Sequence, residues 1–266
     1  MMNQELYRKK RRQRKKRRRL LTRVCLLFVI IGLGTVAVRL AEQYDKGLFG
    51  LSDRTTFSDS FDTQNCPESL LEIARKNPET IEFVENYAKE KTKKHTINLS
   101  GEVNKGTIPL FMQWDTRWGY EMYGDDMMAV TGCGPTCLSM VVCGLSGSLE
   151  WSPLKVAQMA EEKGYYVSGS GSSWNLMSEG AGELGLTVHK IRFEESAIKN
   201  SLKNHQPVIC IMGPGDFTTT GHFIVLSGLD SSGKVEVRDP FRRKNSKAWE
   251  LEEIMGQVRE LWAYSY

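Results

Sequence analysis

TGCGPTCLSMVV, residues 131–142, is the stretch that indicates the fold most clearly. Pro135 suits the first turn of a helix, and apolar residues from Leu138 onward recur at helical spacing. The stretch therefore predicts a helix that begins at Cys133 and is anchored in the core by its apolar face. A helix N-terminus carries partial positive charge and free backbone N–H groups, which favour the thiolate of a cysteine placed there. Cys133 is therefore a candidate nucleophile, although a cysteine between two glycines is a weak signal by itself.

The predicted elements change from helices to strands along the chain. Helices are expected at residues 69–74, 78–91 and 176–184. Another helix begins at Ser152 and Pro153, residue types that are preferred at the cap and the first position of a helix. Strands are expected at residues 187–193, 208–212, 222–228, 234–239 and 261–266. Helices followed by strands indicate an α+β domain of about 160 residues.

The strands at positions 222 and 234 are separated by DSSG, residues 230–233, which predicts a hairpin. A turn of this length would place Leu229 opposite Lys234. Continued along the hairpin, this register makes Asp239 the diagonal cross-strand neighbour of His222, on the same face of the sheet. A turn of three residues would break the arrangement.

His222 and Asp239 are the next candidate site residues. His222 opens an apolar strand, which is where a site at a strand end would place its base. Asp239 could accept a hydrogen bond from one imidazole nitrogen and leave the other nitrogen facing Cys133. The alternative for Asp239 is a structural turn cap before Pro240.

The N-terminal residues have a charge pattern of their own. Residues 1–23 hold twelve Lys or Arg and one acid, a net charge of +11, which leaves −7 for the rest of a chain whose total is +4. The segment 20–41 is largely apolar, and Arg23 and Arg39 can extend toward the surface, so that it reaches the length of a membrane span. Because basic residues stay on the cytoplasmic side, the rest of the chain is expected outside the cell. A cleaved signal peptide is the alternative, with residues 35–37 as the nearest match to a cleavage site.

Four segments are therefore expected. They are a basic cytoplasmic tail at residues 1–19, a transmembrane signal anchor at 20–41, a stalk with short helices at 42–104 and a folded domain at 105–266. The basic tail is expected to contact anionic lipid, at about 1 kcal/mol per residue near the surface. Its position directly before an apolar segment argues against nucleic-acid binding, so no nucleic-acid partner is expected.

The remaining cysteines predict neither a disulfide framework nor a metal site. No CxxC pair occurs, which argues against a zinc knuckle, and no cofactor is expected. The downstream cysteines outside the site are expected to be small buried hydrophobic residues: Cys137, Cys143 and Cys210. Three tryptophans are expected to pack in a core: Trp114, Trp118 and Trp174. The glycine-serine loop at residues 169–171 is expected to form a turn near the cleft.

Five runs occur in order in the C-terminal part, namely IPLFMQWDTRWGYEMYG, TGCGPTCLSMVV, GSGSSWNLMSEGAGELGL, DFTTTGHFIVLSG and VEVRDP. Together, over about residues 105–266, they resemble the C39-like cysteine peptidase family of bacteria, within the papain-like superfamily. The resemblance implies a papain-like α+β fold, with N-terminal helices packed on a C-terminal antiparallel sheet.

The resemblance also implies a role for each site residue. Cys133 corresponds to the nucleophile, His222 to the general base and acid, and Asp239 to the orienting residue. The glutamine that holds the oxyanion corresponds to Gln113. In related leader peptidases this glutamine lies closer to the cysteine, in the neighbourhood where this chain has Met127.

Together with the N-terminal pattern, the resemblance implies a cysteine peptidase that is anchored in the cell membrane by a single span and faces outward. Its substrate would be a peptide or protein, hydrolysed through an acyl-enzyme on Cys133. Two alternatives stay open. The same residues could transfer the acyl group to an amine, as in a transpeptidase or amidase acting on cell-wall peptides. The domain could instead be a binding module with a degenerate site.

Overall fold

The computed structural model describes residues 57–58 and 61–266, which fall within one compact unit, Thr55–Tyr266. The expected basic tail at 1–19 and membrane anchor at 20–41 lie outside the described residues. In the part of the chain that is described, no helix has both the length and the apolar character needed to cross a bilayer.

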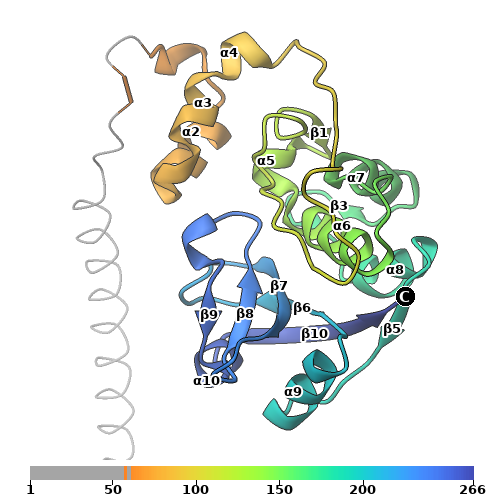
Figure 1. Cartoon of the computed structure of the whole chain (residues 1–266). Coiled ribbons are helices and arrows are strands. Elements are labelled where there is room, and N and C mark those ends of the chain that lie inside the picture. The colour runs from red at the N-terminus through yellow and green to blue at the C-terminus, as the bar shows by residue number, and fades with distance from the viewer. Residues whose placement is uncertain (1–56, 59–60) are drawn as a thin grey trace, which may run out of the picture. The chain divides into compact units, whose positions relative to one another are not determined.

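Helices dominate the first half of the unit and strands the second half (Figure 1). The helical elements are η1 (Thr63–Asn65), α2 (Glu68–Lys76), η2 (Pro78–Thr80), α3 (Ile81–Glu85), α4 (Tyr87–Glu90), α5 (Met128–Thr131), α6 (Cys133–Ser146), α7 (Pro153–Glu162), η3 (Leu176–Gly180), α8 (Ala181–Glu183), α9 (Glu195–Lys203), η4 (Arg243–Asn245) and α10 (Leu251–Met255). The strands are β1 (Met122–Tyr123), β2 (Asp126–Met127), β3 (Tyr166–Val167), β4 (Gly171–Ser172), β5 (Thr187–His189), β6 (Val208–Met212), β7 (His222–Leu229), β8 (Val235–Arg238), β9 (Ala248–Trp249) and β10 (Val258–Ser265).

The main sheet has six strands in the order β5-β10-β6-β7-β8-β9, and every neighbouring pair is antiparallel. In Figure 1 its blue strands lie below the green helices α5, α6 and α7. The architecture is therefore α+β, which confirms the fold class expected from the order of helices and strands. The strand β6 has the predicted bounds, whereas β5 ends four residues before the predicted strand and α9 and α10 were not predicted.

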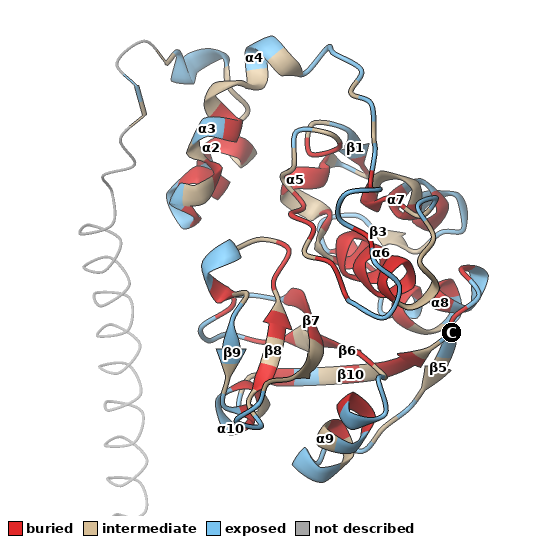
Figure 2. Cartoon of the chain, in the orientation of Figure 1, coloured by how far each residue is buried: buried red, intermediate tan, exposed pale blue. Residues whose placement is uncertain are grey.

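α6 is the central helix of the core. It is buried without interruption from Gly134 to Gly144 (Figure 2), so it is enclosed on all sides rather than on one apolar face. Gly147, at φ 78°, ends the helix in the left-handed conformation, and its N–H donates to the Cys143 carbonyl oxygen. The next helix, α7, begins as predicted, because the Ser152 side chain accepts a hydrogen bond from the N–H of Lys155.

Alternate residues of the central strands pack into two clusters. Ile209 and Val225 pack in the cluster that contains α6, whereas Cys210 and Ile224 pack with α9 and α10. This alternation follows from the two-residue repeat of a strand. The sheet is thereby covered by helices that hold β6 and β7 in the interior.

The β7–β8 hairpin differs from the predicted register at its turn. Leu229 pairs with Val235, not with Lys234, so the loop is one residue longer than expected. A bulge between Leu226 and Gly228 compensates, and Val225 pairs with Arg238. Because the extra loop residue and the bulge cancel, the far end of the hairpin keeps the register that sequence reasoning assumed.

α2 and α3 belong to the same compact unit as residues 105–266. Their apolar residues, including Leu70 and Phe83, form a cluster with Met127 and Ala129 of the following segment. The described part of the expected stalk therefore contains helices that pack on the domain. The boundaries of the four expected segments themselves stay predictions.

Candidate active site

Cys133 lies at the first position of α6, as the sequence predicted. Gly134 follows it, and a Cβ atom at this position would come within 2.4 Å of the Ser172 Oγ. Glycine is therefore required for the close approach of β4 to the start of the helix. The start of α6 and the Gly171–Ser172 strand are brought together beside the thiol.

His222 and Asp239 are hydrogen-bonded to each other. His222 begins β7, Asp239 follows β8, and the His222 Nε2 lies 2.8 Å from the Asp239 Oδ1. With Nε2 turned to the carboxylate, Nδ1 is the ring nitrogen left for Cys133, which lines the same cavities as His222 and whose pKa is lowered by the imidazole. The structure therefore brings Cys133, His222 and Asp239 together at one site.

Asp239 is fully buried, and its carboxylate accepts hydrogen bonds from several donors besides His222. Its Oδ1 accepts from the backbone N–H of Phe241 over 2.8 Å and from that of Arg242 over 3.1 Å. Its Oδ2 accepts from the Asn245 Nδ2 over 2.8 Å. Sequence reasoning missed Asn245, since only the path of the loop after β8 brings it back to the carboxylate. The donors hold Asp239 ionised and fix its orientation toward His222.

The electrostatics of the site favour a thiolate and an imidazolium. Burial opposes the charged form of Cys133, but the hydrogen bond and charge of His222 and the backbone N–H groups of Phe223 and Gly134 outweigh it, so the pKa of Cys133 is lowered. Burial also opposes the imidazolium, but the charge of Asp239 and its hydrogen bond, together with Cys133, raise the pKa of His222 to about 10. The pKa of Asp239 is lowered, because the charge of His222 and the hydrogen bonds to the carboxylate outweigh burial.

Gln113 lies beside the same cavity as Cys133 and His222. Its backbone N–H donates to the Pro240 carbonyl oxygen over 2.8 Å, and its side-chain Nε2 donates to the Ala129 carbonyl oxygen, also over 2.8 Å. The segment between Gln113 and α5 loops out through the β1–β2 hairpin, which brings this distant residue back to the site. The same Nε2 also donates to the Val130 carbonyl oxygen over 3.4 Å, whereas Oε1 has no hydrogen-bond partner.

The cleft around Cys133 has two limbs. The wide limb, of about 840 Å³, is lined by residues of the loop 169–174 and by Ile211 and Phe223. The narrow limb, of about 170 Å³, is lined by α2 and by the loop 218–221. Cys133 and His222 line both limbs, so the thiol lies where they meet. An extended chain could therefore occupy the cleft on both sides of the sulfur.

The three tryptophans and the loop at residues 169–171 differ in whether they lie in the core or line the cleft. Trp118 is fully buried, as expected, and Trp114 is half-buried with its Nε1 donating to the Phe241 carbonyl oxygen. Trp174 is 48% exposed and lines the wide limb, so the expectation that it packs in a core is wrong. The glycine-serine loop lines the same limb, which confirms its predicted place near the cleft.

The other downstream cysteines are fully buried, as expected. Burial raises the pKa of Cys137 well above its ordinary value and that of Cys143 to about 11. Neither thiol therefore shares the character of Cys133. Among the residues described, no group of three or more His, Cys, Asp or Glu side chains is placed to hold a metal ion.

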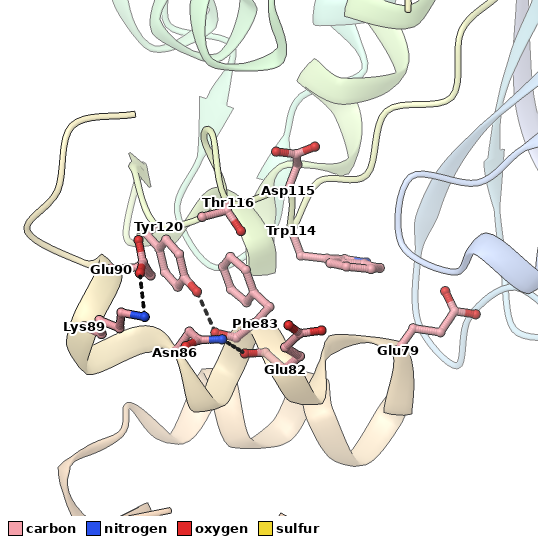
Figure 3. A pocket seen from close by; sticks show the side chains of 10 residues that line it. All are labelled: Glu79, Glu82, Phe83, Asn86, Lys89, Glu90, Trp114, Asp115, Thr116 and Tyr120. Carbon is pink, nitrogen blue, oxygen red and sulfur yellow. Dashed lines mark hydrogen bonds and ion pairs between the residues drawn. The ribbon is translucent and has the colours of Figure 1, made fainter. Parts of the chain in front are cut away.

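A further cavity, of about 450 Å³, contains none of the candidate site residues (Figure 3). Its carboxylates are largely engaged: Glu79 accepts from the backbone N–H groups of Arg243 and Lys244, and Asp115 pairs with Arg117. This cavity lies along α3, and its lining contains neither a cysteine nor a histidine.

Comparison with known proteins identifies a family and similar solved structures. The sequence model described as "Peptidase_C39 like family" matches residues 105–266. The chain is also similar to the crystal structure of the peptidase domain of Streptococcus ComA, a bi-functional ABC transporter involved in a quorum sensing pathway. That similarity has 18% sequence identity and a TM-score of 0.41, and it covers 59% of this chain and 96% of that chain. No curated protein matches the chain.

Proposed function

Because the chain belongs to the peptidase C39-like family, we propose that it is a cysteine peptidase in which the Cys133 thiolate attacks the peptide carbonyl. The observation that carries the proposal is that His222, which is hydrogen-bonded to the buried carboxylate of Asp239, lines both limbs of the cleft together with Cys133. A thiol paired in this way is a nucleophile near neutral pH, whereas an unpaired buried thiol is not.

The reaction follows from the groups at the site. The thiolate adds to the carbonyl carbon, and the His222 imidazolium donates its proton to the departing amine, which leaves an acyl-enzyme. The neutral imidazole then takes a proton from water, and the resulting hydroxide attacks the acyl-enzyme. This step releases the carboxylic acid product and restores the thiolate of Cys133 beside the imidazolium of His222. Asp239 accepts from Nε2 throughout, so that Nδ1 exchanges the proton.

Gln113 is proposed as a side-chain donor to the oxyanion. Its support is its position on the cavity that Cys133 also lines. Its amide nitrogen carries two N–H groups and donates to the carbonyl oxygens of Ala129, over 2.8 Å, and Val130, over 3.4 Å. To hold a negative oxygen in the cavity, the amide would exchange the longer of these two contacts for the oxyanion. Removing such a donor typically lowers the rate by about 100- to 1,000-fold.

The proposal is tested by labelling the full-length protein with an electrophilic peptide probe. We expect the wild type to be labelled at one site and Cys133→Ala not to be labelled. The matched control is Cys137→Ala, which removes a buried thiol one helical turn further along α6 and should leave labelling intact. Equal labelling of wild type and Cys133→Ala would show that Cys133 is not the nucleophile.

The same acyl-enzyme could be resolved by an amine or by water. Digestion of a peptide substrate in ¹⁸O-labelled water, with and without an added amine, separates the two outcomes. Incorporation of ¹⁸O at the new carboxyl end indicates hydrolysis, and capture of the amine indicates transpeptidation. A Cys133 that is alkylated no faster than free cysteine at neutral pH would indicate a degenerate binding module.

We further propose that residues 20–41 anchor the protein in the cell membrane, with the N-terminus in the cytoplasm and the peptidase domain outside. The support is the basic block followed by an apolar segment. In intact cells, an added protease should digest the domain, while the N-terminal tail should stay protected and in the membrane fraction. Protection of the domain in intact cells would refute this orientation.

A further inference from the structure

α2 precedes the residues that match the family, yet it is fixed to the loop that follows Asp239. The Arg242 Nη2 donates to the Lys76 carbonyl oxygen over 3.0 Å. Next to it, the Nδ2 of the buried Asn77 donates to the Phe241 carbonyl oxygen over 2.6 Å. The C-terminal end of α2 is therefore hydrogen-bonded to the loop that holds the carboxylate of the candidate site.

The same helical segment is also fixed to the residues before α6. The ring of Phe83, in α3, stacks on that of Tyr120 with centroids 4.0 Å apart, and the Tyr120 hydroxyl donates to the Phe83 carbonyl oxygen over 2.6 Å (Figure 3). At the start of α2, the Ser69 Oγ donates to the Asp126 Oδ1 over 3.1 Å. Because these contacts hold both α2 and α3, the helices are a packed part of the domain.

α2 supplies one wall of the narrow limb of the cleft. Ser69, Glu72, Ile73 and Lys76 of this helix line the limb, opposite the loop 218–221. At about 170 Å³, the limb is much smaller than the wide limb of about 840 Å³, so it suits a single substrate side chain. Lys76 lines the wide limb as well, so its side chain borders the place where the two limbs meet.

The two limbs have opposite charge. The narrow limb is lined by the cations Lys76 and Arg242 and the carboxylate of Glu72, so these side chains leave it net positive. The wide limb is lined by Lys76 and two carboxylates, Asp125 and Asp126, and is net negative. The Lys76 Nζ pairs with the Glu72 Oε1 over 2.6 Å, but both side chains are about half exposed. A pair so close to water is weak, and a substrate carboxylate can compete for the ammonium group.

We propose that α2 is part of the substrate-binding site and that Lys76 selects a substrate with an acidic side chain in the narrow limb. The inference rests on the proposed peptidase function, since it assigns one side of the cleft to the chain being cleaved. It makes residues upstream of the family domain a determinant of cleavage specificity.

The test uses the full-length protein and octapeptides in which one position at a time is Glu, Gln or Lys. Wild type should prefer Glu to Lys at one position beside the cleaved bond by about fivefold in kcat/KM, the upper range for one half-exposed ion pair. Lys76→Glu should reverse this preference. The matched control is Lys199→Glu in α9, because Lys199 also pairs with a glutamate four residues away and is similarly exposed.

A second measurement separates the inference from the proposed function. In the Cys133→Ala background, binding of fluorescein-labelled Glu and Lys peptides is compared by anisotropy, with and without Lys76→Glu. A reversed binding preference supports the role of Lys76, whether or not the wild type cleaves a peptide. Absence of cleavage by the wild type would overturn only the proposed function. An unchanged preference in Lys76→Glu, or the same reversal in Lys199→Glu, overturns the role of Lys76 and leaves the peptidase function standing.

Discussion

Asp239→Asn is the substitution that tests the electrostatics of the site most directly. It removes the charge opposite the His222 Nε2 while nearly preserving the side-chain volume. The shift of the His222 pKa from 6.5 to about 10 corresponds to on the order of 5 kcal/mol in favour of the imidazolium, at about 1.4 kcal/mol per unit. Asp239 supplies the largest favourable part of this interaction, so without it the imidazole should be neutral at pH 7.

The loss of the imidazolium acts on Cys133. Its pKa is lowered by the hydrogen bond and charge of His222 against the effect of burial. Without that charge, the pKa should return to at least its ordinary value of 9.0. A thiol of that pKa is about 1% ionised at pH 7, so alkylation of Cys133 at pH 7 should fall, by up to about 100-fold if the wild-type thiol is fully ionised.

The assay is the rate of Cys133 modification by iodoacetamide between pH 5 and 10, followed by mass spectrometry. Asp230→Asn is the matched control, because Asp230 lies in the turn of the same hairpin and its carboxylate is exposed, with its pKa lowered chiefly by Ser232. Wild type and the control should reach half-maximal rate well below pH 9, and Asp239→Asn only near or above it. If Asp239→Asn kept the wild-type profile with its fold intact, the ion-pair reasoning would be wrong.

Three further predictions follow from the same contacts. Gln113→Ala should lower kcat by about 100- to 1,000-fold with little change in KM, because it removes the proposed oxyanion donor; a change confined to KM would contradict this role. In Cys133→Ala, His222 no longer couples to the thiol, and its imidazolium pairs with Asp239 alone. This pair stabilises the fold fully at pH values below about 6.5, the pKa of His222 in the unfolded chain. The stabilisation is lost as the pH rises through the higher pKa that His222 has in the folded protein. Urea unfolding should therefore show a free energy of unfolding that falls above pH 6.5, and an equal fall in the Cys133→Ala, His222→Ala double variant would refute this. Ser152→Ala should lower the free energy of unfolding by about 1 kcal/mol, measured by the same method, because it removes the N-cap of α7; no change would mean that the cap is redundant.

Strong local signals predicted the central elements of the fold. The glycine-flanked start of α6 and the Ser-Pro start of α7 lie where the sequence placed them, since capping depends on neighbours in the chain. α9 was missed although Ile198 and Leu202 lie four residues apart on its buried face, because a pattern of so few apolar residues in nine positions was not recognised as a helix. α10 has five residues, too short for a periodic pattern to identify.

The candidate site was predictable in its residue types and less so in its geometry. Cys133, His222 and Asp239 are named by their positions at the ends of elements. Their alignment depends on a bulge between Leu226 and Gly228 that corrects a longer turn, and no local signal required this bulge. The contact of Asn245 with Asp239 and the narrow limb beside α2 arise from packing between distant segments, which the order of residues along the chain does not express.

The packing of α2 and α3 also determines at which residue a soluble fragment of this protein can begin. A fragment that begins at residue 105 would agree with the family match but would uncover the surface of Met127 and Ala129 that Leu70 and Phe83 now shield. An uncovered apolar surface of this kind promotes self-association. Such a fragment should therefore be less soluble than one that begins at residue 61, and preparations of the isolated domain should retain both helices.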